Sequence, residues 1–178
     1  MVFLPVTDHV DFTIELALLD LKAGDGMVEE ASRLLMRAES LAKLNDYSGA
    51  IEAAQHSIEL SVKSLYRLVG LKPPRTHLER IRKKEFGEEN PLELVAERLQ
   101  GIDEYLMIGL GKTSWIGRMW AWAHDTSLYG CLNLPASKLF DQKDANVAVD
   151  YARDALSNCR AITQSVKDGR TKIRPPTA

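Results

Sequence analysis

The sequence predicts an all-α protein, an antiparallel up-and-down bundle of about five main helices. Three observations support this fold class. Apolar residues recur at steps of three and four along residues 47–70, and a second helical pattern over residues 27–44 is joined to them by a very short turn. Strong helix-start signals also precede the later apolar stretches.

Residues 47–70 are predicted to form the central helix of the bundle. The segment contains no proline, and Gly70 stands where a helix would stop. His56 lies on its narrow polar stripe, where a hydrogen-bonded role is favoured over a place in a site. Because the helix is apolar on most sides, other helices should cover it. One face carries Tyr47, Ile51, Ala54, Ile58, Val62, Leu65 and Val69.

The preceding region should form a hairpin with this helix. Residues 1–25 are read as an N-terminal extension with a short helix, although the alternation around Phe12 also fits a strand. Residues 22–26, KAGDG, predict a break, after which Asp25 caps a helix over residues 27–44. The turn at Asn45 and Asp46 is so tight that the two helices must run antiparallel.

Two later helices have clear start signals. Asn90 and Pro91, followed by Glu93, predict a helix that runs to the glycines at 109 and 111. Residues 131–141 are expected to form a loop, and Asp141 with Asp144 should cap a final helix that ends near residue 168. The bundle is thus predicted to span residues 26–169, followed by a flexible basic tail over residues 170–178.

The composition limits the function classes. A formal net charge of −2 over 178 residues gives no general attraction to nucleic acid. Cys131 and Cys159 lack metal or redox spacing, and the four histidines are widely separated, so no metal site and no cofactor are predicted. No apolar run approaches the ~20 residues that cross a membrane, so a cytoplasmic location is expected.

The central hairpin carries a family resemblance. The chain resembles the HEPN domain (higher eukaryotes and prokaryotes nucleotide-binding) over about residues 28–165. The resemblance implies a helical bundle that is usually a homodimer, often encoded beside a minimal nucleotidyltransferase. Many such proteins are toxins of toxin–antitoxin pairs and metal-independent ribonucleases, whereas others bind nucleotides or serve as adaptors. The matching residues are Ala38, Glu39, Tyr47, Ala50, Ala54, Ile58, Glu59, Leu60, Leu65, Gly70, Pro74 and His77.

Residues 114–130 hold the candidate catalytic pair, Arg118 and His124, and all three tryptophans. The pair fits the Arg-x(4–6)-His motif of ribonucleolytic HEPN proteins. His124 would act as acid or base, and Arg118 would hold the phosphate. On one straight helix the two side chains would point about 120° apart, so a helix break or a dimer is required. The alternative is a structural pair, with the tryptophans packed in the core or at a dimer interface.

A basic stretch follows the central helix. Four cations there could bind phosphates, although a solvated helix face is the commoner explanation of such a stretch. The first functional hypothesis is therefore an RNA-cleaving or RNA-binding toxin-type protein with a nucleotidyltransferase partner. The second is a non-catalytic interaction module or nucleotide-binding adaptor. The four candidate phosphate-binding residues are Lys72, Arg75, Arg80 and Lys83.

Overall fold

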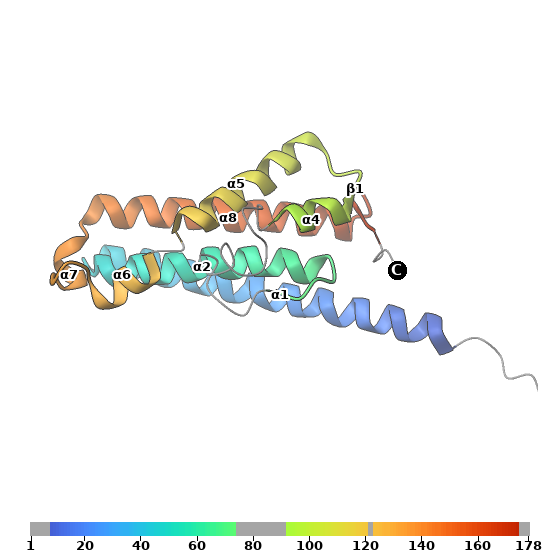
Figure 1. Ribbon diagram of the computed structural model, residues 1–178, viewed down its shortest axis with the longest axis horizontal. Helices are drawn as coiled ribbons and strands as arrows, with labels where there is room; N and C mark the ends of the chain where they lie inside the picture. Colours follow the sequence, from blue (N-terminus) through green and yellow to red (C-terminus); the bar gives the residue numbers. More distant parts are fainter. Residues whose placement is uncertain (1–7, 74–91, 121–122, 175–178) are drawn as a thin grey trace, which may run out of the picture.

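A computed structural model shows an elongated bundle of antiparallel helices, which confirms the predicted all-α fold class (Figure 1). The structure describes residues 8–73, 92–120 and 123–174, with the backbone alone described for residues 8–21, 124 and 125. No helix within these residues is both long and apolar enough to cross a membrane. The elements are α1 (Asp8–Lys43), α2 (Tyr47–Leu68), α4 (Glu93–Arg98), β1 (Leu99–Gln100), α5 (Glu104–Trp120), α6 (Ala123–Tyr129), α7 (Ala136–Leu139), α8 (Gln142–Lys167) and β2 (Lys172–Ile173).

Helix α2 occupies the centre, as the sequence predicts, and packs against α1, α5, α6 and α8. Its N-terminus is capped by Asp46, whose side chain accepts a hydrogen bond from the Gly49 amide at 3.1 Å. Small serines let neighbouring helices come close, and the Ser57 hydroxyl donates to the Ala31 carbonyl of α1 at 2.8 Å. After the helix, Gly70 has a φ of +71°, which allows the chain to turn away.

The predicted break at residues 22–26 is wrong, because α1 continues through them as one helix. Gly24 is buried against α2, where a Cβ would lie 3.5 Å from the Ser64 carbonyl oxygen. Asp25 does not cap a helix. Its carboxylate instead forms an ion pair with Lys167 of α8, with both oxygens 2.8 Å from Nζ. Close helix packing therefore outweighs the roughly 1 kcal/mol that a helical glycine costs.

The helix predicted to run from Pro91 to the glycines at 109 and 111 is two helices. The chain leaves α4 through β1 and turns at Gly101, whose φ of +70° ends any helix, before α5 begins. Both later glycines lie inside α5 rather than at a helix end. Gly109 faces α8, where a Cβ would lie 3.1 Å from Asn158 Oδ1, so this glycine brings the two helices together.

The loop predicted over residues 131–141 contains the short helix α7 and follows a tight turn at Gly130. A Cβ on Gly130, at φ +78°, would lie 2.0 Å from the Leu134 carbonyl oxygen, so only glycine fits. After this loop, Asp141 caps α8 as predicted. Its carboxylate accepts from the Asp144 amide at 3.0 Å, while the Asp144 carboxylate accepts from the Asp141 amide at 3.0 Å.

The segment after α8 is not wholly a free tail, in contrast to the prediction. Gly169, at φ +71°, ends α8, and β2 then pairs antiparallel with β1, with Leu99 opposite Ile173. Thr171 is buried, and its hydroxyl lies 2.8 Å from the Ser165 hydroxyl in a hydrogen bond. These contacts hold residues 170–174 against the end of the bundle.

Candidate functional site

The candidate catalytic pair lies on two different helices. Arg118 is in the last turn of α5, whereas His124 is the second residue of α6, and residues 121–122 between these helices lie outside the described residues. Helix α5 packs mainly against α8, but α6 packs against α2 (Figure 1). Of His124, the structure describes the backbone alone.

Arg118 presents its guanidinium to solvent. It is exposed and makes no hydrogen bond or ion pair with any described residue. One turn earlier on the same outer face, Trp115 is 54% exposed and touches Tyr151 of α8 edge-to-face, with ring centroids 5.8 Å apart. Lys112, one further turn back, is also exposed. A free cation beside an exposed aromatic ring is an arrangement that can contact a phosphate and stack on a base.

The tryptophans divide between the core and the surface. Trp120 is buried beside Ile116 in the apolar cluster around the first half of α2, as expected for core packing. Trp115 is not part of that core and remains open on α5. Trp122 lies outside the described residues. The prediction of core or interface packing is therefore confirmed for Trp120, whereas the role of Trp115 depends on what covers it.

The predicted basic patch is described at one position only. Lys72 is exposed just after α2, whereas Arg75, Arg80 and Lys83 lie outside the described residues. Lys72 also lies far along the bundle from Arg118. Residues near Arg118 pack around the first half of α2, but Lys72 follows its opposite end (Figure 1). The described structure therefore does not bring Lys72 and Arg118 into one site.

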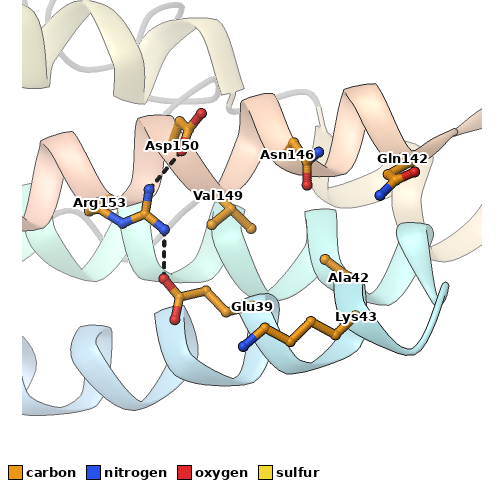
Figure 2. A pocket seen from close by; sticks show the side chains of 8 residues that line it. All are labelled: Glu39, Ala42, Lys43, Gln142, Asn146, Val149, Asp150 and Arg153. Atoms are coloured by element: carbon orange, nitrogen blue, oxygen red, sulfur yellow. Dashed lines mark hydrogen bonds and ion pairs between the residues drawn. The ribbon is translucent and has the colours of Figure 1, made fainter.

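An open pocket of about 470 Å³ lies between α1 and α8 (Figure 2). Arg153 crosses it, donating to Glu39 Oε1 at 2.7 Å and to Asp150 Oδ1 at 2.7 Å. The hydrogen bond to Glu39 is the main reason that the pKa of Arg153 is raised. The pocket is lined by Glu39, Ala42, Lys43, Gln142, Asn146, Val149, Asp150 and Arg153.

The side chains that line this pocket carry both positive and negative charges. Two carboxylates, a lysine, a paired arginine and two side-chain amides face it, so it favours a small polar or zwitterionic group over a polyanion. The sequence did not predict this pocket. The only available signal was the step of four, three and four residues that places Gln142, Asn146, Val149 and Arg153 on one side of α8.

The two cysteines are free thiols in different surroundings. Cys131 is exposed, whereas Cys159 is completely buried between α8 and α2. Burial raises the pKa of the Cys159 thiol to about 12. Among the side chains that the structure describes, no three His, Cys, Asp or Glu residues gather as a metal site would need.

Helices α1 and α2 form an antiparallel hairpin that α8 and α5 cover. This arrangement belongs to the class of antiparallel helical bundles. Residues 26–107 match the family model of the HEPN domain, which confirms the predicted resemblance over this part of the chain. A crystal structure similar to this chain is that of TT1696 from Thermus thermophilus. It has a TM-score of 0.51 and 17% sequence identity, and the match covers 78% of this chain and 96% of that one. This is a likeness of fold alone. No curated protein matches the chain.

Proposed function

We propose that this HEPN-domain protein is a metal-independent, ribonuclease-like protein that acts on RNA as a homodimer. The observation that carries the proposal is the exposed guanidinium of Arg118, which makes no hydrogen bond or ion pair with any described residue and lies one turn from the exposed ring of Trp115.

The chemistry uses the RNA itself as the nucleophile. His124 removes the proton from a 2′-hydroxyl, and that oxygen attacks the adjacent phosphorus while the bond to the 5′ oxygen breaks. The products are a 2′,3′-cyclic phosphate and a 5′-hydroxyl, whose oxygen takes up a proton. An imidazole suits this task because its unperturbed pKa lies near neutrality.

Arg118 would hold the phosphate during this step. A guanidinium can donate two parallel hydrogen bonds to phosphate oxygens and so stabilise the charge that develops in the transition state. Trp115, one turn away, offers a ring on which a neighbouring base can stack. Lys72, Arg75, Arg80 and Lys83 belong to the proposal as attraction for more distant parts of the RNA backbone. The partner in such a two-component system would be a minimal nucleotidyltransferase acting as antitoxin.

The test is cleavage of a labelled structured RNA in EDTA by wild type and by His124→Ala. Both proteins are first compared for folding by circular dichroism and for mass in solution. Cleavage that survives EDTA and is lost in the folded variant supports the proposal. Equal cleavage by both proteins, or no cleavage by wild type across several RNAs, contradicts it.

The second candidate function is a non-catalytic interaction module. It is favoured by the large apolar side chains that α5 leaves exposed, since contiguous exposed apolar surface marks interaction sites. Ile108 is 52% exposed and Trp115 is 54% exposed on the same outer face. In this alternative, Arg118 contributes to recognition of a protein rather than to chemistry.

A further inference from the structure

The pocket between α1 and α8 is built around a guanidinium that both helices hold (Figure 2). Arg153 donates through Nη2 to Glu39 Oε1 on α1 and through Nη1 to Asp150 Oδ1 on α8, each at 2.7 Å. Each carboxylate uses one oxygen in these bonds, and its second oxygen has no hydrogen-bond donor among the described residues. Two carboxylates beside one guanidinium therefore leave a negative excess and open acceptor atoms at this end of the pocket.

Donor groups lie one helical turn away on each helix. Lys43 follows Glu39 by four residues on α1, and Asn146 precedes Asp150 by four residues on α8. Because α1 and α8 run antiparallel, both steps lead the same way along the pocket (Figure 1). Figure 2 shows the Lys43 side chain lying along α1 with its ammonium directed toward Glu39, yet these two groups form no ion pair. Lys43 and Asn146 are without a hydrogen-bond partner in the described part of the chain, so both can donate to a ligand.

The pocket lies at one end of a line of contacts that fixes the register of α8 against α1. These contacts recur every seven residues on both helices, which is close to two helical turns. The apolar base of the pocket comes from Ala42 of α1 and from Val149, which is 6% exposed. The charged side chains are thus presented from a packed helix pair rather than from a loop. The three contacts join Lys167 to Asp25, Arg160 to Ser32 and Arg153 to Glu39.

We propose that this pocket binds a free α-amino acid as its zwitterion. The ligand ammonium donates to the open oxygens of Glu39 and Asp150, and the ligand carboxylate accepts from the Lys43 ammonium and the Asn146 amide. The two charges of an α-amino acid are borne by one carbon, so partners no further apart than one helical turn, about 5.4 Å, can bind both. The volume of about 470 Å³ leaves room for the ligand side chain over Val149.

The balance of charges in the pocket disfavours other classes of ligand. Two acidic and two basic side chains line it, so a ligand with both charges meets a complement to each. Glu39 and Asp150 would repel a phosphate or a polyanion, and Lys43 and Arg153 would repel a polyamine. This inference is independent of the proposed RNA chemistry, because no residue that lines the pocket belongs to α5 or α6.

The test is an NMR titration of the full chain, without RNA, with three related probes. L-alanine carries both charges, L-alaninamide lacks the carboxylate, and N-acetyl-L-alanine lacks the ammonium. L-alanine should bind in the millimolar range, and each derivative should bind at least about tenfold more weakly, because each loses one charged contact in the pocket. L-glutamine and L-leucine, titrated in parallel, test whether longer side chains are accepted.

Two variants assign the contacts. Lys43→Met should abolish the preference for L-alanine over L-alaninamide, and Glu39→Gln should reduce the preference for L-alanine over N-acetyl-L-alanine at least about threefold. Lys22→Met and Glu29→Gln, at exposed positions on α1, are the matched controls and should retain both preferences. Lys43→Met removes no contact within the described chain, so it tests the site even if Glu39→Gln alters the pocket.

Three results would overturn the proposal. The first is no binding of L-alanine, L-glutamine or L-leucine up to about 50 mM. The second is equal binding of L-alanine and its two derivatives, or preferences that neither pocket variant changes. The third is displacement of L-alanine by inorganic phosphate with tighter binding of the phosphate, which would define an anion site instead.

Discussion

Raising the pH should destabilise the fold through Cys159. The thiol is fully buried, and its Sγ donates to the Ser61 carbonyl oxygen of α2 at 2.8 Å, while the Ser64 hydroxyl donates weakly to the sulfur. Desolvation raises the pKa of Cys159 from 9.0 to about 12, against an opposing contribution from the Ser64 hydrogen bond. A thiolate at this position would therefore have to form without water.

The direction and size of the effect follow from linkage between proton binding and folding. Because the folded pKa lies above the unfolded value, the stabilising contribution is complete below pH 9 and is lost as the pH rises from 9 to about 12. A pKa difference of about three corresponds to about 4 kcal/mol at the upper end and to between about 1 and 2 kcal/mol by about pH 10. Tyr66, whose pKa burial raises to about 12 from 10.0, adds a further loss only above pH 10.

The assay is urea unfolding between pH 7 and pH 10.5, with Cys159→Ala and Cys131→Ala as a matched pair. The free energy of unfolding should fall with pH in wild type and in Cys131→Ala. Cys159→Ala should start lower, because it loses buried volume, but should show a flatter pH dependence up to pH 10. Native protein should also react with iodoacetamide at Cys131 alone. Rapid labelling of Cys159, or parallel pH curves for the two variants, would refute the reasoning.

Three further predictions concern helix packing and Arg118. Gly111→Ala should be more stable than Gly109→Ala by about 1 kcal/mol or more in thermal unfolding, because both gain helix propensity but only the Cβ at 109 meets an α8 side chain at 3.1 Å. Equal stabilities would contradict this packing. Glu39→Gln should cost at most about 1 kcal/mol in urea, since its ion pair with Arg153 is partly exposed, and a loss above about 2 kcal/mol would show that this pair is structural. Arg118→Lys should keep the dimer but reduce RNA cleavage at least about tenfold, because a lysine retains the charge without the two-pronged geometry. Unchanged cleavage would remove Arg118 from the phosphate site.

The sequence correctly predicted those helices in which the start and stop signals and the burial of the apolar stripe indicate the same structure. The apolar stripe of α2 is buried, and its start at Asp46 and its end at Gly70 lie where the signals place them. The same is true of α8, where Asp141 and Asp144 form the predicted capping box and the apolar residues Ala145, Val149, Ala152 and Leu156 face the core. In these helices the local preference and the tertiary packing favour the same conformation.

Three of the errors in helix boundaries concern glycines. Gly24 and Gly109 have the local signal of helix breakers, yet each lies inside a helix at a place where an added Cβ would meet atoms of a neighbouring helix within 3.5 Å. Gly101 lies within the helix predicted to run from Pro91 to the later glycines, but its positive φ ends a helix there. A glycine that permits a turn and a glycine that permits close packing have the same local sequence signal, and only the position of the neighbouring helix separates them.

The site was less predictable than the fold, for a related reason. The motif spacing identified Arg118 and His124, but no local signal showed that α5 would pack mainly against α8 whereas α6 would pack against α2. The α1–α8 pocket was missed because its residues come from helices more than ninety residues apart in the chain. Periodicity identifies a face of a helix, but not the face of another helix that it meets.

Helix α5 carries residues of both candidate functions, and its inner face explains why. That face buries Gly109, Thr113 and Gly117, small residues that let α5 lie close to its neighbours without large side chains of its own at those positions. The large apolar residues Ile108 and Trp115 point outward instead. Exposing their apolar surface to water is unfavourable, and this cost is removed only when something covers them. An RNA base could cover Trp115, but it would leave Ile108 exposed, whereas a protein surface can cover both. The distribution of side chains on α5 therefore favours an assembly in which a protein surface covers this outer face and RNA contacts Arg118 at its edge.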